Sequence, residues 1–180
     1  MDTRKTRTWA EVSLGALRHN VEEMQRALPD GCGLLGVVKA DAYGHGASEI
    51  AAALRECGCR YLAVACPQEA LALRQAGETM PILILGAVDA SDMAANDITL
   101  SVECAEKGRA LSAALRGGKR LRIHLKLDTG MGRLGFRVQD ETALREAAAV
   151  AQLPNLDAEG VFTHFSVSDT PGEEEYTAAQ

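Results

Sequence analysis

A lysine ends the first apolar run of the chain. Lys39 directly follows the run at 34–38, and the polar and aromatic stretch from Tyr43 to Gly46 comes shortly after it. A lysine withdrawn from water can have a lowered pKa and can form a Schiff base with a carbonyl compound. Glycines let backbone approach a ligand closely, and a helix N-terminus attracts anions. The alternative is a lysine that reaches from a strand end into water, followed by an ordinary tight turn before a helix.

A second group of candidate residues lies in the stretch 121–135. Polar side chains alternate with leucine or isoleucine over its first half, and Lys126 stands near the end of that alternation. On a strand covered on both faces, the polar side must point into something polar. The glycine-rich stretch DTGMGRLG follows and carries Arg133. Such a loop suits a planar or anionic ligand, although alone it is a weak signal.

A histidine near the end of the chain is the third candidate. His164 lies in the sequence FTHF, at the end of an expected strand. A lone histidine among apolar residues is more often a hydrogen-bonded core residue, and His19 and His124 rank below it. Four candidates fall at or just after the C-terminal ends of expected strands: Lys39, Lys126, Arg133 and His164. Because these ends meet on one face of a parallel α/β fold, the four should share one site.

Short apolar runs that alternate with amphipathic helices must position these residues. Strands are expected at 34–38, 61–65, 82–85, 98–102, 121–127 and 160–165. Helices are expected from a cap at Ser13 to Leu28, around 50–57 up to Gly58, from Pro67 to Gly77, over 103–118, from a cap at Asp140 to Pro154, and from about Glu173. This order predicts a parallel sheet with helices packed outside it.

Two architectures fit this alternation, a doubly wound open sheet and a (β/α)₈ barrel. No G-x-G-x-x-G stretch follows the first expected strand, which disfavours the nucleotide-binding open sheet. A full barrel takes roughly 250 residues, whereas this chain has 180 residues. The residues alone therefore leave two choices, a small open α/β sheet and an incomplete barrel.

The overall composition argues against several classes of function. A formal net charge of −6 disfavours broad binding to nucleic acid or to an anionic membrane surface. No apolar run is long enough to span a membrane, and the basic N-terminus leads into no segment typical of a secretory signal. No CxxC pair occurs, and the CGC at 57–59 is too short for a usual zinc site. These features predict reduced thiols in a cytoplasmic protein without a metal site.

Four stretches resemble bacterial alanine racemase, a pyridoxal-phosphate enzyme on a (β/α)₈ barrel: TWAEVSLGALRHN, VVKADAYGHG, HLKLDTGMGRLGF and GVFTHFS. The resemblance is collinear from about Arg7 to the end of the chain. It implies an α/β fold, an incomplete (β/α)₈ TIM barrel with about six βα units. Residues 1–180 would be the N-terminal portion of the pyridoxal-phosphate-binding barrel domain, with the rest of the barrel and a C-terminal β-domain missing.

The resemblance also assigns roles to individual residues. Lys39 is similar to the lysine that holds pyridoxal 5'-phosphate as an internal aldimine and then acts as the base on the D-alanine side. Tyr43 matches the tyrosine whose hydroxyl bonds the cofactor phosphate. Lys126 resembles a lysine that is often carbamylated. Arg133 matches the arginine beside the cofactor's phenolic oxygen and the substrate carboxylate. His164 matches a histidine in the hydrogen-bond network of the cofactor.

The activity implied by the resemblance is the interconversion of L-alanine and D-alanine, which supplies D-alanine for peptidoglycan. The second base would be a tyrosine from the C-terminal β-domain of a partner subunit, which implies a homodimer of the full-length protein. This chain alone is therefore expected to bind the cofactor weakly and to racemise little. The alternatives are a related serine racemase, a barrel amino-acid decarboxylase that uses the same cofactor, and a non-catalytic single-barrel protein that binds pyridoxal phosphate.

Overall fold

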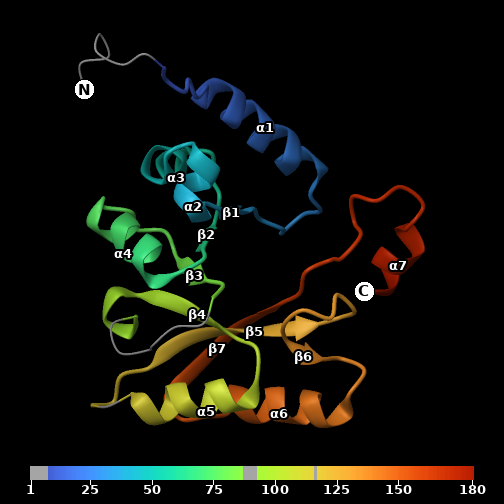
Figure 1. Cartoon of the computed structure of the whole chain (residues 1–180). Coiled ribbons are helices and arrows are strands. Elements are labelled where there is room, and N and C mark those ends of the chain that lie inside the picture. The colour runs from blue at the N-terminus through green and yellow to red at the C-terminus, as the bar shows by residue number, and fades with distance from the viewer. Residues whose placement is uncertain (1–7, 87–92, 116) are drawn as a thin grey trace.

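The centre of the molecule is a curved sheet, which has seven parallel strands in the described part of the chain (Figure 1). The computed structural model describes residues 8–86, 93–115 and 117–180, so the basic stretch at 1–7 lies outside the described residues. The strands are β1 (Leu35–Val37), β2 (Tyr61–Val64), β3 (Ile82–Ile84), β4 (Ile98–Val102), β5 (Leu121–Asp128), β6 (Phe136–Arg137) and β7 (Leu156–Phe162). They pair in chain order from β1 to β5, and both β6 and β7 then pair with β5.

The helices begin where local sequence signals place them. Ser13 accepts a hydrogen bond from the Ala16 N–H, Asp140 accepts one from the Thr142 N–H, and Pro67 opens its helix. The helical elements are α1 (Leu14–Ala27), α2 (Lys39–Gly44), α3 (Ala47–Glu56), α4 (Pro67–Gln75), the 3₁₀ turn η2 (Ala94–Asn96), α5 (Ala105–Ala114), α6 (Glu141–Ala151) and α7 (Glu174–Ala179). In Figure 1, α3, α4, α5 and α6 lie along the outer side of the sheet, and α7 lies near the end of β5.

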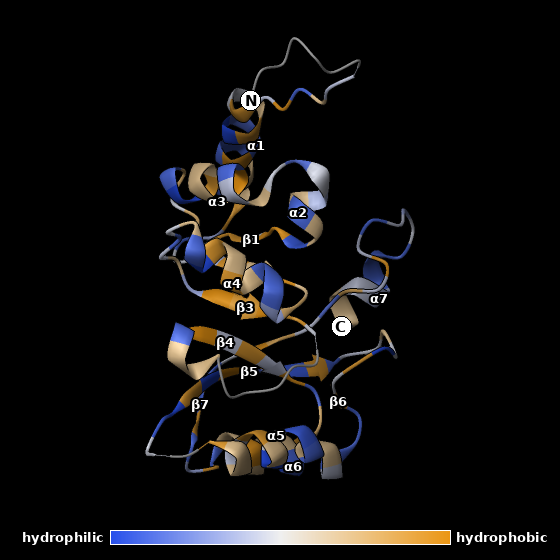
Figure 2. Ribbon diagram, turned by 60° about the vertical axis from the view of Figure 1, so that its left-hand side comes forward, coloured by the Kyte–Doolittle hydropathy of each residue, from blue (hydrophilic) through white to orange (hydrophobic). Residues whose placement is uncertain are grey.

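The sheet has an apolar outer face and a partly polar inner face. Strands β2, β3 and β4 are almost entirely buried, and β3 and β4 are largely orange at the centre of Figure 2. On β4, Thr99 and Ser101 alternate with apolar residues, although both are almost inaccessible to water. Arg122 and His124 continue this polar row on β5, where His124 pairs in register with Ser101. The predicted polar side of this strand therefore faces the inside of the sheet's curve, and the alternate residues face outward.

A glycine on β1 brings α3 close to the sheet. A Cβ on Gly36 would lie 2.5 Å from Leu54 Cδ1 of α3. A larger residue here would have to displace the Leu54 side chain, so glycine lets α3 pack closely on β1. Because β1 leads directly into Lys39, this packing fixes the start of the candidate site.

The architecture confirms the predicted fold class, an incomplete (β/α)₈ barrel with parallel strands and outer helices. The five strands from β1 to β5 lie where the apolar runs predicted them. The last predicted strand, at 160–165, is wrong at both ends, since β7 spans Leu156–Phe162. The first half of β7 contains the charged residues Asp157 and Glu159, so its sequence did not predict a buried strand. The two-residue strand β6 was not predicted, because it is very short and directly follows the glycine-rich stretch 128–135.

Both edges of the curved sheet expose apolar side chains. Leu35 and Val37 on β1 are about two-fifths exposed, and Val161 on β7 is 64% exposed. Within the described part of the chain, β1 pairs only with β2 and β7 only with β5. In the same part of the chain, no helix is long and apolar enough to cross a membrane.

Candidate active site

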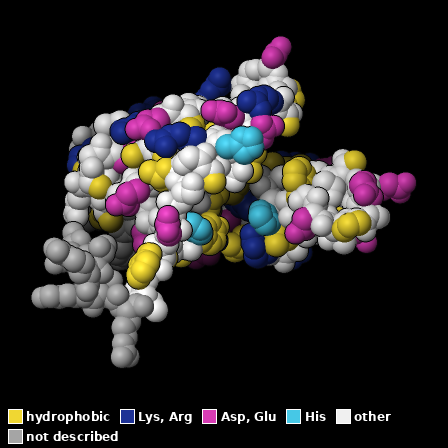
Figure 3. All heavy atoms as spheres, turned by 90° about the horizontal axis from the view of Figure 1, so that it is seen from above, with side chains coloured by type: hydrophobic (Ala, Val, Ile, Leu, Met, Phe, Trp, Pro, Cys, Tyr) yellow, Lys and Arg dark blue, Asp and Glu magenta, His cyan; other side chains and the backbone are white. Residues whose placement is uncertain are grey.

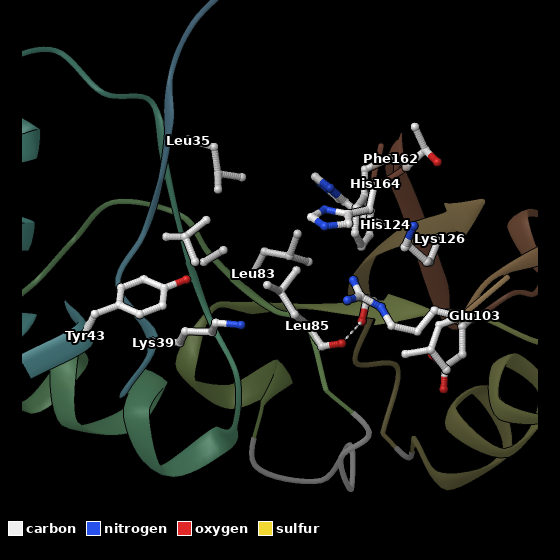
Figure 4. A pocket seen from close by; sticks show the side chains of 16 residues that line it. Leu35, Lys39, Tyr43, Leu83, Leu85, Glu103, His124, Lys126, Phe162 and His164 are labelled. Atoms are coloured by element: carbon white, nitrogen blue, oxygen red, sulfur yellow. Dashed lines mark hydrogen bonds between the residues drawn. The ribbon is translucent and has the colours of Figure 1, made fainter. Parts of the chain in front are cut away.

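A cavity of about 400 Å³ opens at the C-terminal ends of the strands. Seen from above, this face is hollowed, with histidine and basic side chains near the hollow (Figure 3). The five residues singled out from the sequence all line the cavity: Lys39, Tyr43, Lys126, Arg133 and His164. Figure 4 shows Lys39 and Tyr43 entering from one side and Lys126 and His164 from the other. The predicted gathering of these groups on one face is therefore observed, whereas their chemical roles remain predictions.

Lys39 stands at the junction between β1 and an unusual turn. The Val38 N–H continues the strand pairing by donating to the Ala63 carbonyl at 2.8 Å, which carries the backbone straight to the lysine. The amine then lies 5.9 Å from the centroid of the Tyr43 ring. In Figure 4 both side chains point into the cavity, so the end of β1 delivers an amine and a phenol to the same space.

The turn after Lys39 is left-handed. The four residues from Ala40 to Tyr43 have φ between 51° and 56° and ψ between 36° and 49°, and α3 begins only at Ala47. The sequence predicted a tight turn at 43–46 before a helix, and α3 does begin just after it, but the left-handed geometry of residues 40–43 was not predicted. Left-handed helical geometry is disfavoured by roughly 1–2 kcal/mol for each residue with a Cβ, so external contacts must hold the turn.

Two acidic side chains hold the turn, one from α4 and one from within the turn itself. Glu69 Oε1 accepts a hydrogen bond of 2.7 Å from the Ala40 N–H, and Asp41 Oδ1 accepts one of 2.7 Å from the Ala47 N–H. The Asp41 carbonyl also accepts from the Gly46 N–H at 3.0 Å. The polar residues that crowd this stretch thus stabilise its backbone, while Lys39 and Tyr43 are directed into the cavity.

Lys126 is a largely buried amine on the opposite wall. Its Nζ donates to the Leu127 carbonyl at 2.9 Å and lies 5.3 Å from the centroid of the Phe162 ring. Burial lowers the pKa of Lys126, and the Arg133 guanidinium lowers it further, against the opposing effect of Asp128. A larger fraction of this amine is therefore unprotonated, and thus nucleophilic, than for a lysine in water.

Asp128 organises the loop that carries Arg133. Its Oδ1 accepts hydrogen bonds of 3.0 Å from both the Gly130 and the Gly132 N–H groups. These backbone donors hold the pKa of Asp128 below its ordinary value. Gly135 closes the loop with φ at 125°, and a Cβ there would lie 2.7 Å from the backbone of Leu127 and Asp128. The loop is therefore folded back tightly on the end of β5.

His164 lies two residues beyond β7 rather than within a strand. Its pKa is lowered by partial burial and then by the positive charges of Arg133, Lys126 and Lys39. The imidazole is consequently neutral near pH 7 and can both donate and accept a hydrogen bond. It shares the cavity with three cationic side chains, Lys39, Lys126 and Arg133.

His124 also lines the cavity, although its sequence context gave it low rank. Its Nε2 lies 3.4 Å from Glu159 Oε1, and Glu159 also accepts hydrogen bonds from Tyr61 at 2.7 Å and Thr99 at 2.9 Å. Burial lowers the pKa of His124 and Arg122 adds to this, against the opposing effect of Glu159. The strict alternation over 121–127 was the available signal, since it placed His124 on the same side as Lys126.

A β-bulge brings Glu159 into this network. In the pairing of β5 with β7, Ile123 lies opposite Ala158 and His124 lies opposite Gly160, so Glu159 has no partner. A Cβ on Gly160 would lie 3.0 Å from the His124 ring. An unpaired residue in one strand redirects its side chain. Here the bulge turns a carboxylate inward, and the neighbouring glycine leaves room for the imidazole.

The family model and the curated relatives that match this chain all carry the name alanine racemase. The model for the family described as alanine racemase, N-terminal domain, matches residues 12–180. An alanine racemase of Desulforamulus reducens is 42% identical over 165 residues, which cover 89% of this chain and 44% of that protein. One of Geobacillus stearothermophilus is 45% identical over 90% of this chain and 42% of its own length. The chain spans less than half the length of these curated relatives.

Solved structures agree in the arrangement of the backbone. Alanine racemase of Clostridium difficile in complex with cycloserine superposes with a TM-score of 0.88 at 38% identity, covering 97% of this chain and 49% of that chain. A histidine racemase from Leuconostoc mesenteroides superposes with a TM-score of 0.79 at 29% identity, covering 93% of this chain and 46% of that one. The same fold therefore occurs in racemases named for amino acids of different size.

Proposed function

Because the chain belongs to the alanine racemase family, through its N-terminal domain, we propose that it forms the cofactor side of an amino-acid racemase site. The substrate would be alanine, the reaction its interconversion between L and D forms, and the cofactor pyridoxal 5'-phosphate. The observation that carries the proposal is the meeting of Lys39, Tyr43, Lys126, Arg133 and His164 around one cavity.

The cavity residues fit this cofactor. A space of about 400 Å³ is of the size that holds a small ligand. Its cationic groups suit a ligand with a phosphate and a phenolate, and Tyr43 adds a hydroxyl donor. The Lys39 amine reaches the cavity from a strand end. When bound, pyridoxal phosphate supplies an electron sink that stabilises the carbanion at the substrate's α-carbon.

The side chains of the cavity would then divide the remaining work. Lys39 would attach the cofactor and afterwards hold and return the α-proton on one face of the substrate. Arg133 would bind the cofactor's phenolic oxygen and the substrate carboxylate by charge-assisted hydrogen bonds. His164, neutral and next to three cations, would donate or accept in the network around the cofactor. Tyr43 would bind the phosphate.

Lys126 would act through a change of charge. Its lowered pKa favours the unprotonated amine, which is the form that reacts with carbon dioxide. A carbamate on Lys126 would convert a repelling cation next to Arg133 into an anion that orients the guanidinium. The test is a mass measurement of the intact chain with and without bicarbonate, in which Lys126→Ala should abolish any added carbon dioxide.

A racemase needs a second base on the other face of the substrate. We propose that it comes from a partner subunit in a homodimer of the full-length protein, since curated relatives are more than twice as long as the matched region. This chain alone would therefore turn over slowly. The proposal also includes a cytoplasmic location and a role in supplying D-alanine for peptidoglycan. The histidine racemase relative makes a panel of alanine, serine and histidine the appropriate substrate test.

Covalent trapping tests the cofactor assignment directly. The chain is mixed with pyridoxal phosphate, reduced with borohydride, digested and analysed by mass spectrometry. We expect the pyridoxyl group on the peptide that contains Lys39 and not on the peptide with the exposed Lys119. Lys39→Ala should lose the label, whereas Lys119→Ala should keep it. Equal labelling of both peptides would contradict a specific site.

A further inference from the structure

We propose that Glu69 is a positioning residue for Lys39. The two oxygens of its carboxylate hold two backbone N–H groups, one on each of the first two strand ends, and this clamp keeps the strained turn that directs the lysine into the cavity. The inference rests on the proposed function only in taking Lys39 as the reacting amine. The clamp itself is a feature of the folded chain.

The geometry of the clamp is specific. Glu69 Oε1 accepts from the Ala40 N–H and Oε2 accepts from the Ala65 N–H, each at 2.7 Å. Ala40 directly follows Lys39, and Ala65 directly follows β2. The two backbone segments are therefore joined through a single side chain that α4 supplies.

A glutamate at the helix position of Glu69 normally accepts a hydrogen bond from the N-cap residue of its own helix. Glu69 is the third residue of α4, after Pro67, and the N-cap residue of this helix is Cys66. Glu69 instead bonds the N–H of the residue before Cys66 and the N–H of Ala40. A local helix-capping role thus does not account for the contact with the lysine turn.

The turn has no glycine at the residues that need it most. Ala40, Asp41, Ala42 and Tyr43 are all left-handed, and glycine first appears at Gly44. Strained backbone at a site persists only where surrounding contacts hold it. The Ala40 N–H lies at the start of the strained segment, so its bond to Glu69 fixes the direction in which the backbone leaves Lys39.

A glutamine is a sharp probe of this clamp. Glu69→Gln replaces one acceptor oxygen with an NH₂ group, which cannot accept from a backbone N–H. Glu106→Gln is the matched control, because Glu106 lies in the first turn of α5, which also follows a cysteine N-cap, and it is exposed. Both changes remove one negative charge from a helix N-terminus, but only the first breaks the clamp.

Residue-resolved amide exchange on the full chain tests the clamp without any cofactor. Ala40 and Ala65 are exposed residues, so protection of their amides reports the bonds to Glu69. We expect Glu69→Gln to speed exchange at one or both of these amides by about tenfold, the loss of a charge-assisted hydrogen bond. Glu106→Gln should change neither. Unchanged exchange in Glu69→Gln would overturn the proposal.

Borohydride trapping of pyridoxal phosphate then tests positioning. In Glu69→Gln we expect the rate of labelling at Lys39 to fall about tenfold, with the thermal midpoint close to that of Glu106→Gln. A fall in midpoint with an unchanged labelling rate would show a structural role only and would contradict positioning. If the parent chain fails to label Lys39, the proposed function fails, while the exchange data still judge the clamp.

A second variant covers the case in which Glu69→Gln does not fold. Glu69→Asp keeps the charge at the start of α4, but its side chain is one methylene shorter and cannot span both donors. We expect faster exchange at Ala40 or Ala65 and partial labelling of Lys39. Full protection of both amides in this variant would also overturn the clamp.

Discussion

Two segments follow strand ends on either side of the cavity. Both contain residues with positive φ, but the residues that adopt these angles differ. The segment after β1 is left-handed over Ala40 to Tyr43, without a glycine among those residues. The loop after β5 has positive φ only at Gly130, Gly132 and Gly135. Glycine adopts such angles with little strain, so the second loop relies on residue type. The first relies on hydrogen bonds to Asp41 within the turn and to Glu69 in another helix.

The carboxylates that hold the two segments also differ in their distance along the sequence. The Asp128 carboxylate holds its own loop through the N–H groups of Gly130 and Gly132. The lysine turn depends in part on Glu69, which lies in another helix and 29 residues from Ala40. Hydrogen bonds between residues close in sequence, such as those of Asp128, can be anticipated from the sequence. A hydrogen bond between residues far apart in sequence, such as that of Glu69 to Ala40, is found only in the folded structure.

The largest expected effect is on the glycine loop. In Gly135→Ala, the new Cβ would lie within 2.7–2.8 Å of three backbone atoms and would sit at a φ of 125°. Because backbone cannot move aside cheaply, we expect a loss of about 3 kcal/mol in the free energy of unfolding. Urea denaturation measures it.

Gly132→Ala is the matched control for this change. Gly132 also has positive φ, but its Cβ would meet no atom within 4 Å. The expected loss is about 1 kcal/mol, from the left-handed angle alone. Equal losses at the two positions would mean that close backbone approach does not matter in this loop.

Removing the Asp128 carboxylate, which holds the glycine loop, should have an intermediate effect on the free energy of unfolding. Asp128→Ala leaves the Gly130 and Gly132 N–H groups without their acceptor, which should cost about 2 kcal/mol. Asp128→Asn keeps an acceptor oxygen and should lose less. Asp157→Ala, on the exposed side of β7, should change the free energy of unfolding by less than about 0.5 kcal/mol.

The same carboxylate predicts a pH dependence. The folded pKa of Asp128 lies below its ordinary value of 3.8, because backbone N–H groups bind the charged form. Its contribution to stability is therefore fully present above the unfolded pKa and is lost as pH falls through the folded pKa. The difference in stability between the parent chain and Asp128→Ala should shrink below about pH 4. A constant difference down to pH 2 would contradict this sign.

Much of the fold was predictable because its signals are local. Apolar runs bounded by capped helices placed β1 to β5, and their alternation with helices predicted a parallel sheet with outer helices. The choice of a barrel over an open sheet came from the family resemblance. The site face was predictable as well, since Lys39, Lys126, Arg133 and His164 lie near or just after the C-terminal ends of strands and line one cavity. Resemblance to a family supplied the chemical roles, which residue pattern alone did not name.

The remaining features depend on contacts between distant segments. Glu159 faces inward because a bulge shifts the register of β7. The residue pattern of LDAEGVF does not predict this bulge. The alternation over 121–127 places His124 on the inner side, but the space that its ring needs comes from Gly160 on the neighbouring strand. The left-handed turn contains Ala40 and Ala42, and alanine favours a right-handed helix in isolation. Tertiary contacts outweigh local preference at each of these points.

The smallest expected effect tests the lysine turn through its strain. Ala40 is exposed and has φ at 52°, so Ala40→Gly should relieve the strain and raise the free energy of unfolding by about 1 kcal/mol. Ala148, an exposed residue inside α6, provides the opposite case. There the same substitution weakens a right-handed helix and should lower stability by about 1 kcal/mol. Thermal or urea unfolding of the two variants measures the sign directly, and destabilisation by both would show that the turn stores no strain at Ala40.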